Sequence, residues 1–571
     1  MAILSLAAAL DPVSGVEFHF ARVVFVFAIL KSFSIGVFFA LISFGKKTLK
    51  WFYVILNLLF FEICLYLVIQ FNVRITPNVM TLVLQTNTTE AKEFFYSYFP
   101  LSTIVPMVLF AVGILVSYYL CDSFWKKRLT VKFGGYKFIL AAIAMIFTFS
   151  AYTNTLVDTR FADCKRPEKY VISPILYSTT FPHQDLYLAL LAISGNEEKV
   201  EKIYNANKEV VVDSCEYSSP NIVFVVGESY IKSHSSLFGY NHQTNPLLEK
   251  EMKSGNLFVF DDVLSHSSGT NVCMQYFYST KSVDDNNIWE EQPLFPAIFK
   301  KAGYYVSLVD NQNSRYTGSA GLDYTTSFFI NPLNIHNQCF DYRNENVYKY
   351  DLQLIESEIK RIKAVKSNHT MNIFHLYGQH VDASGRFPHE KCYEYFSADS
   401  IHRADLKNDV AKRQAIADYD NATRYNDLVL SKILDLYRDK DAVLVYVSDH
   451  GECIYDDSAL TYGRAISEKK ADETIKLLYE VPMVVWCSNT YKTNHPEMVN
   501  RIMESRNKPF MHDDMCHVLF DLAGISGNFY HPERSVINDK YIPRKRIVGE
   551  KYDYDSIKSK MSKIKLRNIN N

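Results

Sequence analysis

The chain has 571 residues, enough for two or three domains, and its 61 Lys and Arg against 62 Asp and Glu give a formal net charge of −1. This balance excludes the global basic charge with which nucleic-acid-binding proteins hold phosphate backbones, and we expect no nucleic-acid partner. Apolar residues make up 48% of the sequence. Long apolar runs dominate up to residue 160, and the remainder is typical of a soluble α/β protein.

Four runs in the N-terminal part are long enough to cross a bilayer, which takes roughly 20 apolar residues. We place these spans at 18–43, 51–71, 98–120 and 137–157, in a helical transmembrane domain over 1–157. The alternative is that they are buried helices of a soluble protein. Four such runs with aromatic-rich edges in so short a stretch favour the membrane.

The placement of Lys and Arg predicts the orientation of these spans. The loops at 43–51 and 121–137 are rich in Lys and Arg and are therefore predicted to be cytoplasmic, whereas the loop at 72–97 is poor in both. By alternation, the N-terminus and everything after residue 157 lie outside. Residues 1–10 are apolar but too short to span, so they are either the remnant of a first span or a lipid-surface segment.

Residues 158–220 form a predicted connector. It contains Pro167, Pro174 and Pro182 and a predicted helix over 184–207, which either lies along the membrane surface or is an ordinary amphipathic domain helix. Eight of the ten cysteines follow residue 160. An even number in an oxidising compartment allows disulfides, but the pairing cannot be deduced from the sequence.

From residue 221 to 555, strand-like runs alternate with helical runs. Strands are predicted at 221–227, 304–310, 371–377, 442–448 and 481–486, and helices at 292–302, 348–366, 409–438 and 511–523. This alternation predicts an α/β/α domain with a mostly parallel sheet that is covered on both faces. The Lys- and Asn-rich tail at 556–571 is expected to be frayed.

Two predicted strands end on acidic and imidazole side chains. The run AVLVYVSDHGE ends on Asp449 and His450, and NIVFVVGES ends on Glu228. A single Glu or His after a strand is usually a cap or a surface residue. Here, however, the carboxyl ends of parallel strands meet at one edge of a sheet, where ligands gather. Oxygen and nitrogen donors suit Zn²⁺ or Mn²⁺, so the sequence predicts one shared metal site.

Thr270 follows Ser267, Ser268 and Gly269 at a predicted loop-to-helix transition. A hydroxyl at a helix N-terminus is ordinarily a cap. The same position, however, places a nucleophilic oxygen where free N–H groups stabilise an anionic phosphate. A nearby metal would lower the pKa of the hydroxyl, which makes Thr270 the candidate nucleophile.

The motifs NIVFVVGES, SSGT, FHLYGQH and YVSDHGE, in this order behind several spans, resemble the phosphoethanolamine transferases of the Gram-negative envelope. The resemblance covers essentially the whole chain. It implies an alkaline-phosphatase/sulfatase-like fold, a multi-pass inner-membrane protein and a periplasmic catalytic domain. The implied reaction is transfer of phosphoethanolamine from phosphatidylethanolamine to lipid A or the lipopolysaccharide core, with weaker binding of cationic peptides as its consequence.

The resemblance also assigns site residues. Glu228, Thr270, Asp449 and His450 match the zinc ligands of the family, with Mn²⁺ as the alternative metal. Thr270 also matches the nucleophile, which carries phosphoethanolamine as a covalent intermediate in a ping-pong reaction. His380, in GQHVDASG, matches a histidine that contacts the transferred phosphate or a second zinc.

Two further positions are expected to bind substrate: Asn271, next to the nucleophile, and Arg315, where relatives often carry a basic residue near the phosphate. The chain departs from its relatives in the segment CIYDDSALTYGRA, which has no histidine where relatives carry one. The second metal and the acid for the leaving group are therefore left open. Candidate substitutes for that histidine are Tyr462, Asp456 and Asp457. The four spans also stand against five that are usual in the family.

Three alternatives remain beside this interpretation. A related transferase with a glycerol-phosphate donor would share Thr270 and the metal. A sulfatase is disfavoured because that class needs a Cys or Ser at the nucleophile position. A catalytically inactive membrane scaffold would be favoured by loss of a ligand, but all four predicted ligands are present.

His375, inside an apolar strand, is expected to support the core or the site rather than bind metal.

Overall fold

The computed structural model describes residues 196–569, apart from 314–324, 381 and 465–469, together with scattered helical positions between 51 and 119. The predicted spans at 18–43 and 137–157 therefore lie outside the described residues. In the described part of the chain, no helix has both the length and the hydropathy to cross a membrane. The helix predicted at 184–207 is observed from its middle onward, as α10 (Asn196–Glu209).

A seven-stranded mixed sheet is the centre of the fold. Its order is β3 (Leu257–Phe260), β11 (Met483–Cys487), β8 (Ala442–Ser448), β2 (Asn221–Gly227), β7 (Thr370–His375), β5 (Tyr305–Asp310) and β6 (Tyr342–Arg343). β2 pairs in parallel with both β7 and β8, and β5 pairs in parallel with β7 and β6. Only β11 runs against its two neighbours among these strands. The predicted mostly parallel sheet is confirmed.

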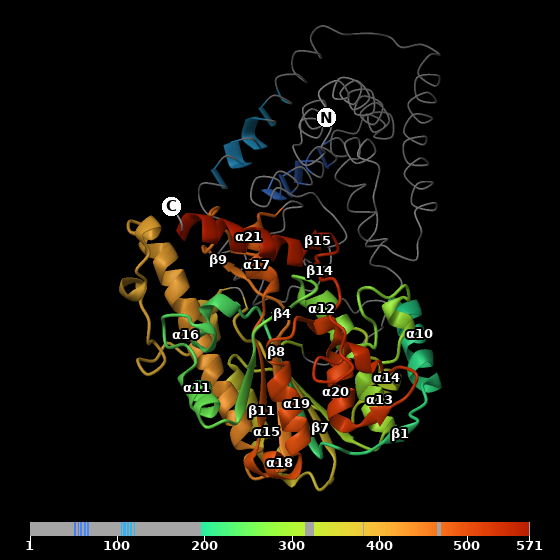
Figure 1. The fold of residues 1–571 in the computed structure, drawn as a ribbon. Coiled ribbons are helices and arrows are strands. Elements are labelled where there is room, and N and C mark those ends of the chain that lie inside the picture. The colour runs from blue at the N-terminus through green and yellow to red at the C-terminus, as the bar shows by residue number, and fades with distance from the viewer. Residues whose placement is uncertain are drawn as a thin grey trace, which may run out of the picture. The chain divides into compact units, whose positions relative to one another are not determined.

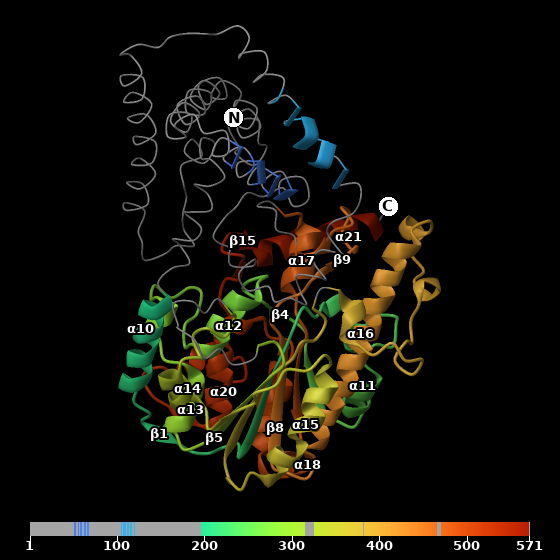
Figure 2. The same cartoon turned by 180° about the vertical axis from the view of Figure 1, so that it is seen from behind.

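Helices cover both faces of this sheet, as Figure 1 shows and Figure 2 shows from behind. One face carries α11 (Pro246–Lys253), α15 (Asp351–Ala364) and α16 (Val410–Asp435), and the other carries α13 (Phe295–Lys301), α14 (Leu333–Cys339) and α20 (Met515–Ala523). The alternation of side chains along β2 separates the two cores. Phe224 packs among residues of α13 and α20, whereas Val223 and Val225 pack among residues of α15 and α16.

Further elements complete the domain. The further helices are α12 (Thr270–Tyr278), α17 (Asp472–Tyr479), α18 (Asn489–Asn494), α19 (Pro496–Ser505) and α21 (Tyr554–Ile569). The two-stranded pairs are β1 (Ser214–Cys215) with β13 (Ile525–Ser526), β4 (Val263–Leu264) with β12 (Phe510–Met511), β9 (Cys453–Ile454) with β10 (Tyr462–Gly463), and β14 (Ile547–Val548) with β15 (Tyr552–Asp553).

Two expectations differ from this structure. The chain forms α21 over most of the segment where a frayed tail was expected, and this helix is tied back to the domain by the ion pair of Lys560 with Asp472 (Nζ to Oδ2, 2.7 Å). The helix predicted to begin at residue 511 begins at Met515, because Phe510 and Met511 pair with β4 as strand β12 and His512–Asp514 form a 3-10 turn. The described cysteines are free thiols: Cys215, Cys273, Cys339, Cys392, Cys453, Cys487 and Cys516.

Candidate active site and metal centre

The predicted ligands meet at the carboxyl edge of the sheet. Glu228 follows β2, Asp449 and His450 follow β8, and Thr270 is the first residue of α12. Thr270 Oγ1 lies 3.1 Å from Glu228 Oε2 and 3.3 Å from His450 Nε2. Thr270 is 4% exposed and the other three are fully buried. The structure thus brings together the four residues that the sequence placed in one site.

Strained and close-packed backbone fixes Glu228 in place. The residue after it, Ser229, adopts a left-handed conformation (φ +55°), which is costly for a residue with a side chain. Its N–H donates to Asp449 Oδ1 (3.1 Å), and its carbonyl oxygen accepts from the Tyr419 hydroxyl (2.6 Å). Gly378 has φ +52°, and a Cβ there would lie 2.8 Å from the Glu228 carbonyl oxygen, so only glycine fits beside Glu228.

His450 presents a free nitrogen to this site. Its Nδ1 lies 2.6 Å from the carbonyl oxygen of Gly451, which can only accept, so Nδ1 carries a proton and Nε2 is the nitrogen that a metal would bind. Nε2 lies 3.4 Å from both Glu228 Oε1 and Asp449 Oδ2. Asp449 Oδ2 is buried and has no hydrogen-bond partner. The carboxylates of Glu228 and Asp449 and the imidazole of His450 therefore converge, and Asp449 Oδ2 has no hydrogen bond to satisfy it. This donor set fits a zinc-type cation.

Burial disfavours the charged form of each titratable side chain at the site, and the charges of its neighbours shift the pKa values of these side chains in different directions. Burial alone would raise the pKa of Glu228, but the hydrogen bond and charge of His450 and the charge of Arg464 hold it well below its ordinary value. Burial and the Glu228 charge raise the pKa of Asp449 to about 6. Burial would lower the pKa of His450, but the neighbouring carboxylates raise it. A bound cation would neutralise this concentrated negative charge.

Two residues of the site were missed from the sequence. Arg464 Nη2 lies 3.2 Å from both Thr270 Oγ1 and Glu228 Oε1. Gln312, just after β5, donates from Nε2 to Glu228 Oε2 (2.9 Å) and to the Leu376 carbonyl oxygen (2.9 Å). Arg464 belongs to the very segment that lacks the expected histidine, and a search for any cationic side chain there would have found it.

His380 lies beside the cluster, after β7. It is half-buried, its Nδ1 is buried without a hydrogen-bond partner, and the charge of Glu228 acts on it. Burial lowers the pKa of His380 to about 3, so the ring is neutral near pH 7. Asn271 accepts a hydrogen bond from Gln275 Nε2 (3.3 Å) within α12, and its substrate-binding role stays a prediction. Arg315 lies outside the described residues.

The candidate substitutes for the absent histidine are engaged elsewhere. Asp456 Oδ1 accepts from Arg403 (2.9 Å), Asp457 accepts from the Thr461 hydroxyl (2.6 Å), and Tyr462 stacks on a neighbouring tyrosine. His375 is buried, and its Nδ1 lies 3.0 Å from Asp310 Oδ1, in keeping with the expected supporting role.

Comparison with protein families gives two matches. Residues 220–525 match the family described as Sulfatase, which is more than half of the chain. Residues 32–178 match the family described as Phosphoethanolamine transferase EptA/EptB. The first match contains every residue of the site described above, and the second covers most of the predicted membrane domain and the first third of the connector.

Named relatives agree with these matches. Phosphoethanolamine transferase EptC of Escherichia coli (strain RS218) is 24% identical over 511 residues, 87% of this chain and 84% of the relative. The periplasmic domain of E. coli EptC in complex with Zn is similar in fold (TM-score 0.51, 22% identity, 61% of this chain and 96% of that chain). The integral membrane protein lipooligosaccharide phosphoethanolamine transferase A from Neisseria meningitidis has a TM-score of 0.58 at 18% identity and covers 94% of this chain and 97% of its own.

Proposed function

Because the chain belongs to the sulfatase family and, within it, to the phosphoethanolamine transferases, we propose that it transfers phosphoethanolamine from phosphatidylethanolamine to lipid A or the lipopolysaccharide core through Thr270. One observation carries the assignment of the nucleophile. The hydroxyl oxygen of Thr270 lies at the start of α12, within 3.3 Å of a carboxylate, an imidazole and a guanidinium. Such convergence on a single hydroxyl is what nucleophilic catalysis requires.

The proposed reaction has two halves. Thr270 gives up its proton, which its hydroxyl already donates toward Glu228 Oε2 (3.1 Å), and Oγ1 bonds to the donor phosphorus. The bond from phosphorus to the glycerol oxygen breaks, and diacylglycerol leaves with a proton. A hydroxyl or phosphate oxygen of the acceptor then bonds to the same phosphorus, the bond from phosphorus to Thr270 Oγ1 breaks, and the proton given up by the acceptor restores the Thr270 hydroxyl. The two halves predict ping-pong kinetics.

The metal in this proposal is zinc, held by Glu228, Thr270, Asp449 and His450. A cation at this position would supply Lewis-acid stabilisation to the nucleophilic oxygen and to the phosphoryl oxygens. The donor set and the unpartnered Asp449 Oδ2 support it, as does the zinc complex of the E. coli EptC domain. Manganese is the alternative, which metal analysis of the purified protein separates.

The remaining polar residues would act on the phosphoryl group. Arg464 carries a positive charge 3.2 Å from Thr270 Oγ1, so its guanidinium would reach the non-bridging oxygens of a phosphoryl group on that oxygen. His380 would donate a hydrogen bond to the same group as a neutral ring. Gln312 would keep Glu228 oriented through its 2.9 Å hydrogen bond.

We further propose that residues 1–157 anchor the enzyme in the inner membrane with residues 221–555 in the periplasm. The match of residues 32–178 to the transferase family and the likeness to an integral membrane transferase support this. Such an anchor would hold the site at the depth of a lipid head group. The proposal of a lipid A or lipopolysaccharide-core acceptor is supported by the name of the Neisseria relative, which is a lipooligosaccharide phosphoethanolamine transferase.

A donor assay tests the function. The full chain, purified in detergent with zinc, is incubated with phosphatidylethanolamine or with phosphatidylglycerol, and release of diacylglycerol is measured. We expect release from the ethanolamine lipid alone and none from Thr270→Ala. Release from the glycerol lipid alone would move the assignment to a glycerol-phosphate transferase. No release from either lipid would favour the inactive scaffold.

A further inference from the structure

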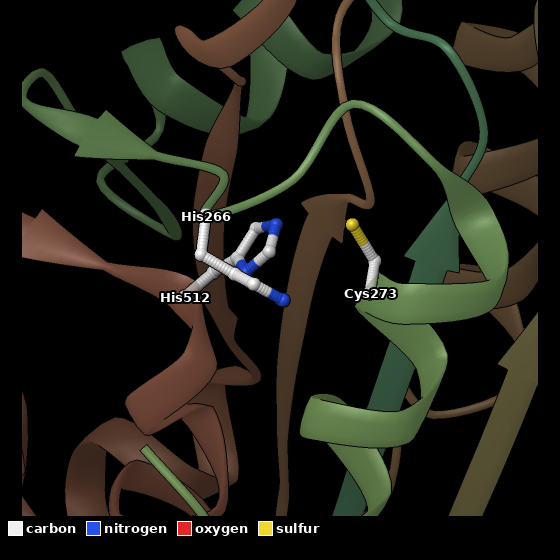
Figure 3. A group of neighbouring side chains, drawn as sticks. All are labelled: His266, Cys273 and His512. Atoms are coloured by element: carbon white, nitrogen blue, oxygen red, sulfur yellow. The ribbon is translucent and has the colours of Figure 1, made fainter. Parts of the chain in front are cut away.

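A second cluster of metal-ligating side chains lies beside the active site and has no role in the reaction proposed above. It consists of His266, Cys273 and His512, whose candidate ligand atoms all lie within 4.8 Å of one another. All three residues are buried: His266 is 5% exposed, and Cys273 and His512 are fully buried. Figure 3 shows Cys273 Sγ pointing from α12 toward the two imidazole rings.

The fold builds this cluster from three separate pieces of backbone. β4 and β12 pair in parallel, with Leu264 opposite Met511, and His266 and His512 follow the ends of these paired strands. The two rings therefore lie side by side, with centroids 5.3 Å apart and planes at 84°. Cys273 lies one helical turn after Thr270 on α12, so its side chain is on the same side of that helix.

The ring nitrogens of the cluster lack the partners that buried polar atoms normally have. His512 Nε2 lies 2.6 Å from the carbonyl oxygen of Asp449, which can only accept, so Nε2 carries the proton and Nδ1 holds a lone pair. That Nδ1 is buried without a hydrogen-bond partner, and so are both ring nitrogens of His266. Buried polar atoms without partners are rare and costly, and a bound metal would use these lone pairs.

We propose that His266, Cys273 and His512 form a second metal site, built for zinc and separate from the centre around Thr270. Two imidazole nitrogens and one sulfur are the ligand types that zinc takes in proteins, in a tetrahedral arrangement with one further position. Ser265 Oγ, 3.5 Å from Cys273 Sγ, is the nearest side-chain oxygen to that thiol among the contacts described.

Metal binding here is an exchange of a proton for a metal, without oxidation or reduction. The Cys273 thiol now donates to the Ser267 carbonyl oxygen (3.4 Å). On binding, its proton leaves to solvent, a metal–sulfur bond forms, and the two imidazoles bind through lone pairs. The bound metal would join α12, which begins with the nucleophile, to His512, which holds the backbone of the metal ligand Asp449. The site would therefore brace the active centre, and its existence does not depend on the proposed reaction.

Cobalt titration tests this site with a spectroscopic signal of its own. The full chain in detergent is stripped with a chelator and titrated with Co²⁺, which reports a bound thiolate through a sulfur-to-metal charge-transfer band. The centre around Thr270 has only oxygen and nitrogen donors, so any such band comes from a cysteine site. Because the Thr270 centre can also take Co²⁺, we expect a band that is complete by two Co²⁺ per chain, is bleached by added Zn²⁺ and is absent in Cys273→Ser.

The matched control is Cys339→Ser, which removes another fully buried thiol, on α14, and should keep the band. The wild-type spectrum is decisive even if a variant folds poorly. A wild-type protein saturated with Co²⁺ that shows no thiolate band would overturn the site, and so would a band that persists in Cys273→Ser. A band bleached by Cu⁺ but not by Zn²⁺ would overturn the assignment of zinc. Failure of the donor assay together with a thiolate band would refute the proposed function and leave this site standing.

Discussion

Replacing Arg464 by glutamine should slow the first half-reaction without emptying the metal centre. Arg464 supplies the positive charge nearest to Thr270 among the contacts described, with Nη2 3.2 Å from Oγ1, and it provides no metal ligand in our proposal. Glutamine keeps a hydrogen-bond donor but removes the charge. The loss should therefore fall on the stabilisation of the phosphoryl oxygens as their charge develops.

The magnitude follows from the geometry. Coulomb's law for unit charges 3.2 Å apart, at an effective dielectric constant of about 20, gives about 5 kcal/mol. The Arg464 side chain is 21% exposed, so solvent screens part of this energy. We expect about 3 kcal/mol of lost transition-state stabilisation, which is on the order of 100-fold in rate.

The assay is the single-turnover rate of diacylglycerol release from phosphatidylethanolamine, with zinc content measured on the same preparation. Arg501→Gln is the matched control. Arg501, on α19, is 25% exposed and forms an ion pair with Asp521 on α20, outside the site around Thr270. We expect Arg501→Gln to keep the wild-type rate. A rate for Arg464→Gln within threefold of wild type, at equal zinc content, would refute the reasoning.

Three further predictions concern the metal loop and a buried ion pair. His450→Ala should lower the zinc content by one ion per chain and abolish transfer, as elemental analysis with the donor assay would show; unchanged zinc would exclude this ligand. Gly451→Ala should destabilise the fold by about 1–3 kcal/mol, since its Cβ would lie 1.9 Å from a carbonyl oxygen of α17; an unchanged melting temperature would contradict the described packing. Although burial opposes it, the charges of Asp456 and Asp420 raise the pKa of His234 to about 10. The stability from this protonated ring is complete below its unfolded pKa of about 6.5 and is lost as pH rises toward 10, by a few kcal/mol; thermal unfolding of wild type and His234→Asn at pH 7 and 9.5 should therefore converge at the higher pH, and parallel curves would contradict the pairing.

The strands that build the site could be predicted closely from the sequence. β2 and β8 are observed at the predicted residues, because each is a continuous apolar run that is buried on both faces and bounded by polar residues. Since both are parallel neighbours, their carboxyl ends had to meet. Glu228 and Asp449 followed directly from that arrangement.

Other parts of the site depend on contacts between distant segments, which local sequence patterns do not contain. Arg464 reaches Glu228 across 236 residues of chain, and Gln312 reaches it across 84. The hydropathy pattern of a loop does not indicate which distant residue a polar side chain of that loop contacts in the folded protein. α21 is a similar case, since its Lys- and Asn-rich sequence is typical of a frayed end and its ion pair with Asp472 is formed only in the folded domain.

The most direct test of the central claim is the intact mass of the purified, zinc-loaded protein before and after incubation with phosphatidylethanolamine, with Thr270→Ala beside it. We predict that the wild-type chain gains the mass of one phosphoethanolamine group, that peptide mapping places it on Thr270, and that the variant gains nothing. A wild-type chain that turns over the donor without any gain in mass, or an adduct that persists in Thr270→Ala, would contradict the proposed covalent intermediate.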